Sequence, residues 1–375
     1  MQGNLRIGIE ERLLHFRQPA GTSRGIYTER RVWLLTVADD KGHRGVGECA
    51  PLPDLSCDAL PGTYGQVLRH ICDEVEQTGV IDYEAMRPYP SMLFGLETAL
   101  LSLSVQTEEK HRVLQGTGWH GGLPLLFDTP FARGEEGIPI NGLVWMGSHD
   151  EMMHRLEQKL QQGYRCVKLK VGAIDFEQEL DLVRCVRSRF GPREVELRLD
   201  ANGGFCYDGG EALYKLELLS QYAIHSIEQP IKAGQWACMA ELCRESPLPI
   251  ALDEELIGVN DPEAKRQLLH IIKPAFIVLK PSLHGGIDGC REWISLARSE
   301  GIGSWMTSAL ESNVGLNAVA QFCSDVYGPA VSMPQGLGTG QLFTDNIPMP
   351  LQVRGDRLWA MDAPGAKMDE GGQQY

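Results

Sequence analysis

The chain has 375 residues, with 35 basic and 50 acidic side chains and a formal net charge of −15. This length exceeds the usual single core of about 250–300 residues and predicts a large domain plus a smaller one. An acidic chain without a basic run lacks the charge pattern of nucleic-acid or membrane binding, so the expected partner is a small molecule, and an anionic substrate would need local positive charge in its pocket.

Residues 1–125 are predicted to form a small α+β capping domain. Its strand-like and helical runs are 5–16, 31–38, 44–49, 62–78 and 91–105. Between the first two strands, the glycines of the loop 21–27 suggest mobility, which makes this loop a candidate lid. A stretch rich in Gly and Pro, 116–137, is expected to lead into the second domain.

Residues 136–344 are predicted to form a (β/α)8-type barrel, a modified TIM barrel of the α/β class. The expected strands are 138–145, 165–171, 194–200, 224–228, 249–253, 275–280, 302–307 and 329–333. Amphipathic helices are expected between them, because apolar residues recur at spacings of three or four, as at Phe176, Leu180, Val183, Val186 and Phe190.

The tail, 345–375, contains one more strand-like run at 351–360. Because this run follows the last barrel strand, we expect the tail to return and complete the N-terminal capping domain. The ten cysteines form no Cys-x-x-Cys pair, which is typical of reduced core residues in a cytoplasmic protein. The sequence has neither an N-terminal apolar segment nor a run near the roughly 20 apolar residues of a membrane span.

Seven polar side chains recur at steps of 29, 30, 28, 25, 27 and 28 residues, nearly all at the ends of predicted strands. They are Asn141, Lys170, Asp200, Glu228, Asp253, Lys280 and Ser308. All strands of a closed barrel end on one rim, so side chains that are remote in sequence converge there on one pocket.

Asp200, Glu228 and Asp253 end three consecutive predicted strands. A single acid in such a place is more often a loop carboxylate that caps the next helix. Three close carboxylates repel one another unless a cation lies among them, and an all-oxygen ligand set favours Mg²⁺, with Mn²⁺ as a substitute. The trio therefore predicts a divalent metal site.

Lysines are expected on two sides of the carboxylate trio. Lys168 and Lys170 lie on the same face of their predicted strand, and Lys280 ends the sixth strand, across the pocket. A lone barrel lysine is usually a solvated charge or a structural ion pair, but a second ammonium and a metal ion can lower the pKa of a lysine enough for it to act as a base. Acids and opposed lysines together indicate removal of a proton next to a carboxylate.

Several short motifs resemble the muconate-lactonizing-enzyme subgroup of the enolase superfamily in order and spacing. They are Lys168-x-Lys170, Asp200-Ala201-Asn202, Glu228-Gln229-Pro230, Asp253-Glu254, Lys280-Pro281 and, in the capping domain, 47–53 and a helix with Gly95, Glu97 and Ala99. The resemblance covers nearly the whole chain and implies a barrel with a capping domain.

Within this subgroup the chain is most similar to the o-succinylbenzoate synthase family, through segments 198–202, 308–315 and 335–340. The resemblance implies a hydro-lyase of menaquinone biosynthesis that removes water from 2-succinyl-6-hydroxy-2,4-cyclohexadiene-1-carboxylate to give 2-succinylbenzoate. It also implies that Lys170 is the base and that Lys280 stabilises the enediolate. Lys168 is expected to support the charge of the site and lower the pKa of Lys170, because its ammonium lies next to that of Lys170.

Substrate contacts are expected from residues near the same rim. The distal carboxylate of the substrate could rest on backbone amides near Ser308 and the glycine-rich turn 336–340, where residues without a Cβ allow close approach. The candidates are Arg24, Asn141, Arg198, Asn202, Ser308, Glu311, Gly336 and Gly338.

The residues leave several alternatives open. The N-succinylamino acid racemases and dipeptide epimerases of the same superfamily share most motifs, although the epimerases usually carry an Asp-x-Asp where this chain has 332–335. A Schiff-base lyase using Lys280, or a barrel that only binds a ligand, would also contain strand-end lysines. The oligomeric state stays open, including a homo-oligomer.

Overall fold

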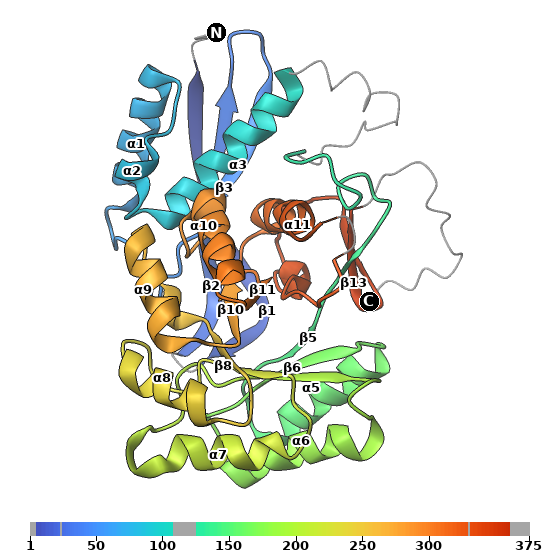
Figure 1. Cartoon of the computed structure of the whole chain (residues 1–375). Coiled ribbons are helices and arrows are strands. Elements are labelled where there is room, and N and C mark those ends of the chain that lie inside the picture. Colours follow the sequence, from blue (N-terminus) through green and yellow to red (C-terminus); the bar gives the residue numbers. More distant parts are fainter. Residues whose placement is uncertain (1–4, 23–24, 108–124, 329–330, 361–375) are drawn as a thin grey trace, which may run out of the picture.

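The computed structural model describes residues 5–22, 25–107, 125–328 and 331–360. A capping unit lies at one end of the molecule, and the helices and strands of a curled parallel sheet lie beneath it (Figure 1). The predicted α/β class, a barrel-type domain with an N-terminal cap, is confirmed.

The capping unit is a three-stranded antiparallel sheet packed against helices. Its strands lie in the order β1 (Arg6–Thr22), β2 (Gly25–Ala38) and β3 (Arg44–Cys49). Its helices are α1 (Tyr64–Thr78), α2 (Tyr83–Met86) and α3 (Pro90–Thr107). The expected loop 21–27 is largely part of a long hairpin, because β1 and β2 pair out to Thr22 and Gly25; residues 23 and 24 lie outside the described part.

Glycines in β3 allow α3 to approach the sheet closely. A Cβ on Gly45 would lie 1.9 Å from the carbonyl oxygen of Ala99, and a Cβ on Gly47 would lie 2.0 Å from that of Gly95. No larger residue fits at either position, so the Gly-containing motif of the cap fixes the distance between strand and helix.

The second unit is a parallel sheet whose strands follow one another in space as they do in sequence. They are β5 (Gly142–Val144), β6 (Cys166–Lys170), β7 (Glu196–Asp200), β8 (Ser226–Glu228), β9 (Ile250–Leu252), β10 (Phe276–Leu279) and β11 (Gly303–Met306). Each parallel step needs a crossover, and helices supply it. The six crossover helices are α5 (His149–Gln161), α6 (Phe176–Arg189), α7 (Glu211–Ser220), α8 (Trp236–Glu245), α9 (Pro262–Ile272) and α10 (Gly286–Ser299), with 3₁₀ turns η1 (Asp208–Gly210) and η2 (Glu254–Leu256). Helix α11 (Asn313–Tyr327) and the 3₁₀ turn η3 (Gly338–Gln341) follow β11.

The expected eighth strand, 329–333, is not a strand in its described part, 331–333. Its place is taken by Gln335 and Gly336, which form single parallel bridges to Ile140 and Thr307. These two residues link β11 to the start of the barrel. Pro334, which precedes these bridges, has no backbone N–H to donate to the ladder.

The tail also differs from the prediction. Strands β12 (Leu351–Arg354) and β13 (Arg357–Ala360) form a hairpin that pairs with β4 (Ile138–Pro139), not with the capping sheet. Leu358 and Ala360 are buried in the barrel core beside Ile138, which explains this choice of partner. Contact with the cap comes from the preceding segment, where Thr344 N donates to His15 O over 2.9 Å.

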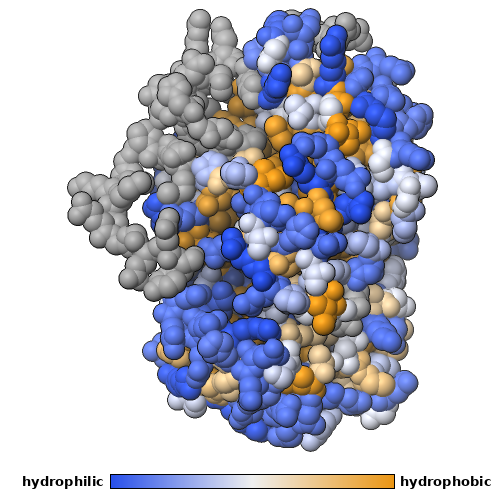
Figure 2. Space-filling view, turned by 180° about the vertical axis from the view of Figure 1, so that it is seen from behind, coloured by the Kyte–Doolittle hydropathy of each residue, from blue (hydrophilic) through white to orange (hydrophobic). Residues whose placement is uncertain are grey.

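The barrel core lies between the sheet and the surrounding helices. Leu180, Val183 and Val186 of α6 are buried against it, as their spacing predicted. All ten cysteines are free thiols. One face of the molecule is mostly hydrophilic, with small groups of apolar side chains (Figure 2), and no described helix has the length and apolar character needed to cross a bilayer.

Candidate active site

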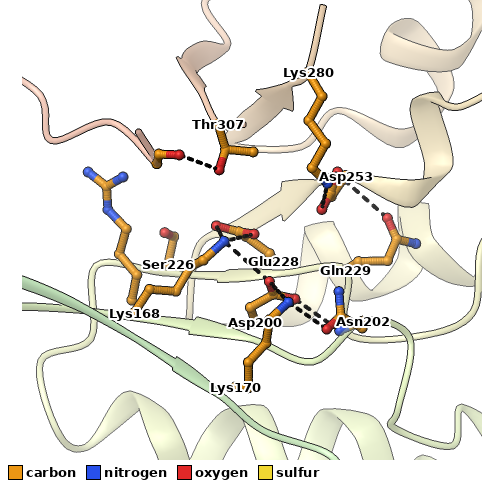
Figure 3. Close-up of polar contacts among 12 residues, drawn as sticks. Lys168, Lys170, Asp200, Asn202, Ser226, Glu228, Gln229, Asp253, Lys280 and Thr307 are labelled. Carbon is orange, nitrogen blue, oxygen red and sulfur yellow. Dashed lines mark hydrogen bonds and ion pairs between the residues drawn. The ribbon is translucent and has the colours of Figure 1, made fainter. Parts of the chain in front are cut away.

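Strand register brings the predicted acids and lysines together. Lys170 is paired in register with Asp200, and Asp200 with Glu228, so their side chains leave three adjacent strands at the same height. Asp253 follows β9 directly, and Lys280 follows β10. Figure 3 shows these side chains pointing toward one another, with Lys168 and Lys170 on one side and Lys280 on the other.

The three carboxylates form a compact, buried group. One oxygen from each of Asp200, Glu228 and Asp253 lies within 4.8 Å of the others, and none of the three residues is more than 1% exposed. A set of hard oxygen donors with this spacing fits a divalent cation. The structure therefore contains an Asp-Glu-Asp group able to hold a metal ion.

The lysines are hydrogen-bonded to the same acids. Lys168 Nζ donates to Glu228 Oε2 over 2.7 Å and lies 3.2 Å from Asp200 Oδ2. Lys170 Nζ donates to Asp200 Oδ2 over 2.5 Å and to Asn202 Oδ1 over 2.7 Å. Lys280 Nζ donates to both carboxylate oxygens of Asp253.

Burial and charge act in opposite directions on these groups. Burial favours neutral Asp200, but the ammonium groups of Lys170 and Lys168 outweigh it and lower the pKa of Asp200. Burial raises the pKa of Glu228 to about 7, because Lys168 only partly offsets burial and the negative charges of Asp200 and Asp253. Burial also opposes ionisation of Asp253, but the ammonium of Lys280 outweighs it and lowers the pKa of Asp253.

Asp200, Asp253 and the three lysines form the floor of a cavity of about 260 Å³, and Glu228 lies beneath them. Asn141, Asn202, Ser308, Gly336 and Gly338, which were predicted to contact substrate, lie in its wall. Arg24 lies outside the described residues.

Arg198 and Glu311 do not line this cavity. Arg198 precedes Asp200 by two residues and therefore lies one layer deeper in the barrel, where its guanidinium stacks over Trp305 and donates to Pro334 O over 2.9 Å. Glu311 is fully buried and accepts from the hydroxyl of Ser308 over 2.5 Å. Arg198 therefore supports the barrel interior, and Glu311 holds the side chain of Ser308; neither side chain reaches the cavity.

Several lining residues were not among the predicted contacts. Tyr27, Leu52 and Leu55 come from the cap, and Trp145 and Leu342 come from the barrel domain. Tyr27 ends the loop singled out for its glycines, and Leu52 lies in the cap motif 47–53, so both segments carried a signal. Arg155 and Lys159 of α5 also lie in the wall, and no sequence pattern had marked them.

Comparison with known proteins gives a consistent result. A family model described as enolase C-terminal domain-like matches residues 151–369. An o-succinylbenzoate synthase from Desulfotalea psychrophila is 42% identical, covering 92% of this chain and 96% of that protein. The crystal structure of MenC from the same organism aligns with a TM-score of 0.76 and 38% identity, covering 95% of this chain and 99% of the other.

An L-Ala-D/L-Glu epimerase from Bacillus subtilis is 25% identical, covering 80% of this chain and 79% of the epimerase. The resemblance to the enolase superfamily is confirmed, because the family model covers more than half of the chain and the 42% identical relative covers nearly all of it. The chain belongs to the enolase superfamily.

Proposed function

We propose that the protein is an o-succinylbenzoate synthase, which removes water from 2-succinyl-6-hydroxy-2,4-cyclohexadiene-1-carboxylate to give 2-succinylbenzoate. The observation that carries the proposal is the placement of Lys170 and Lys280 on opposite sides of three buried carboxylates. The relative of that name, similar over nearly the full length of both chains, supports the choice of substrate.

Asp200, Glu228 and Asp253 would hold Mg²⁺. When bound, the metal ion supplies positive charge that makes a proton next to a carboxylate easier to remove. One oxygen from each of the three carboxylates lies within 4.8 Å of the other two, and water or substrate oxygens would complete the ligand set.

Lys170 is the proposed base. Its Nζ is held by Asp200 and Asn202 at the floor of the cavity, and it takes the proton from the carbon next to the ring carboxylate. The electron pair of that C–H bond then expels the β-hydroxyl group, which leaves as water after accepting the proton that Lys170 removed. Formation of the aromatic ring drives this second half of the reaction.

Lys280 and Lys168 are proposed to act through charge. Lys280 presents an ammonium on the other side of the cavity, where it can stabilise the negative charge that develops in the substrate. Lys168 is paired with Glu228 and keeps the floor of the site near neutrality. The distal carboxylate of the substrate is assigned to Ser308 and the turn that begins at Gly336.

The test is an aromatisation assay, followed by the ultraviolet absorbance of the product. Purified protein should convert the succinyl cyclohexadiene substrate, lose activity with EDTA and regain it with Mg²⁺, with Mn²⁺ tested as a substitute. Deuterium exchange into N-succinylamino acids is measured in parallel. Rapid exchange without any aromatic product would refute the synthase and leave the superfamily membership intact.

Racemisation of N-succinylamino acids is the second candidate function, because opposed lysines suit proton transfer on two sides. A dipeptide epimerase is less favoured: Gln335, in the segment where those enzymes carry an acid pair, is 1% exposed and bonded to Met306 N. A Schiff-base lyase needs a neutral Lys280. Burial lowers the pKa of Lys280, but Asp253 and Glu254 outweigh burial and raise it, so borohydride should trap no substrate adduct.

A further inference from the structure

Arg30 of β2 reaches out of the capping sheet and is almost fully buried, at 2% exposure. Its guanidinium donates to backbone carbonyls of two separate loops. In the cap it bonds the carbonyls of Ala50 and Pro51. In the barrel domain Nε donates to Leu310 O over 3.1 Å and Nη2 to Ala309 O over 3.3 Å.

Both loops continue directly into the wall of the active-site cavity. Leu52 follows the cap loop, and Leu52, Ala309 and Leu310 all line the cavity. Arg30 does not line the cavity. It therefore touches the residues that form the apolar wall without touching the space that a substrate would fill.

Leu310 has a backbone conformation that needs support. Its φ is 63°, in the left-handed region that costs a non-glycine residue about 1–3 kcal/mol. Two groups hold it there: Arg30 Nε bonds its carbonyl, and the hydroxyl of Ser308 accepts its N–H over 3.1 Å. Without the guanidinium, the loop could relax and move Leu310 relative to Leu52.

The fixed fork of an arginine suits this task. Five N–H groups in one plane can satisfy several carbonyls at set positions, whereas a lysine offers three donors from one atom. The buried carboxylates of Glu311 and Glu48 supply negative charge near Arg30. The surroundings of Arg30 therefore fit a planar guanidinium better than they would fit the ammonium of a lysine.

We propose that Arg30 is a positioning residue that sets the apolar wall of the active site by holding the cap loop 50–52 and the barrel loop 308–310 in a fixed relative position. Its effect falls on substrate binding and not on proton transfer, because it contacts none of Lys168, Lys170 and Lys280. The kinetic test of this inference rests on the proposed function, because it uses the substrate of that reaction.

The experiment compares Arg30→Lys with Arg31→Lys in the aromatisation assay. Arg31 is the neighbouring residue on the same strand, with a side chain 55% exposed and paired with Glu11. Arg30→Lys should raise KM about tenfold or more, as expected for lost bonds from a buried charge, and keep kcat within about threefold of the wild type. Arg31→Lys should change neither. An unchanged KM in Arg30→Lys, or a fall in kcat alone, would overturn the inference.

A second measurement needs neither a variant nor a substrate. In the wild-type protein, amide hydrogen exchange is followed at Leu52 and Leu310, whose N–H groups bond Ser56 and Ser308. If one guanidinium holds both loops, the two amides open together and exchange at rates within about threefold. Rates that differ more than about tenfold would contradict the proposal. This result stands if Arg30→Lys does not fold or if the wild type proves inactive as a synthase.

Discussion

Lys170, Asp200 and Glu228 illustrate how a single residue acquires its role from its position along a strand. They occupy equivalent positions in β6, β7 and β8 and meet at the strand ends. Arg198 is two residues earlier on β7, points to the same side, and lies among Trp305 and Pro334 instead. On β7, two residues along the strand separate a residue of the reaction site from one that packs the barrel interior, whereas on β6 both Lys168 and Lys170 line the cavity.

Lys170→Met should lower kcat by about 10²–10⁴-fold, because a positioned base contributes that much to proton transfer. Binding of 2-succinylbenzoate, measured by calorimetry, should stay within a few-fold of the wild type. Lys41→Met, in an exposed turn of the cap, is the control and should behave as the wild type. A Lys170→Met enzyme that retained a tenth or more of the turnover would exclude Lys170 as the base.

Arg198→Met should destabilise the protein without weakening substrate binding. It removes a buried cation stacked over Trp305 at 4.5 Å and a hydrogen bond to Pro334 O, and we expect a loss of about 2–4 kcal/mol in the free energy of unfolding. Urea unfolding and steady-state kinetics check the two effects. A higher KM with unchanged stability would instead place the guanidinium at the substrate.

At the scale of elements, two carboxylates of the cap bond the N-termini of barrel helices. Glu48 of β3 accepts from Ser312 N and Gly315 N at the start of α11. Glu97 of α3 accepts from Ile287 N over 2.6 Å at the start of α10. These N–H groups have no partner within their own helix, so the cap completes the helices that surround the active site.

The protonation of Glu97 should make the stability of the protein depend on pH. Burial raises the pKa of Glu97 to about 8, against the smaller opposing effect of its bonds to Ile287 and Asp288. The folded state therefore binds more protons than the unfolded state between 4.5, the ordinary pKa of a glutamate, and about 8, and stability falls as pH rises through this range.

The glutamine side chain of Glu97→Gln cannot titrate. Between about pH 5 and 8 the Tm of the wild type should therefore fall further than the Tm of Glu97→Gln, and the two falls should differ by roughly 2 °C or more. Thermal unfolding at a series of pH values in one buffer system measures the difference. Parallel curves for the two proteins would show that Glu97 does not change its protonation in this range.

On the scale of the whole molecule, the cavity belongs to neither unit alone. Its floor comes from the ends of β6, β7, β9 and β10, and part of its wall comes from Tyr27 and Leu52 of the cap. The barrel itself is closed by Gln335 and Gly336 through single bridges. Contacts between the units, including those of Arg30, Glu48 and Glu97, therefore determine the shape of the site as well as its stability.

A divalent cation should stabilise the whole fold. At about 100 times its Kd, Mg²⁺ should add about 2.7 kcal/mol to the free energy of unfolding, because only the folded chain brings Asp200, Glu228 and Asp253 together. Thermal unfolding with MgCl₂ should show a higher Tm for the wild type and for Asp150→Asn, whose side chain is fully exposed. Asp200→Asn should show little or no shift, and an equal shift would place the metal elsewhere.

The sequence by itself predicted the class of the fold and the chemistry of its rim. Lys170, Asp200, Glu228, Asp253 and Lys280 were found because strand ends recur with the βα period and because side chains alternate along a strand, and both patterns are local. The helix α6 was predicted for the same reason, since its buried face follows from a spacing of three or four residues.

Only the tertiary structure decided which cap residues reach the cavity, where the barrel closes and which strand receives the tail. Tyr27, Gln335 and the β12–β13 hairpin owe their places to partners that are far away in sequence, and no local pattern encodes the identity of such a partner. The same holds for Arg30, whose sequence neighbourhood is that of an ordinary strand residue. Its role follows from four carbonyl groups that only the folded chain brings within reach of one guanidinium.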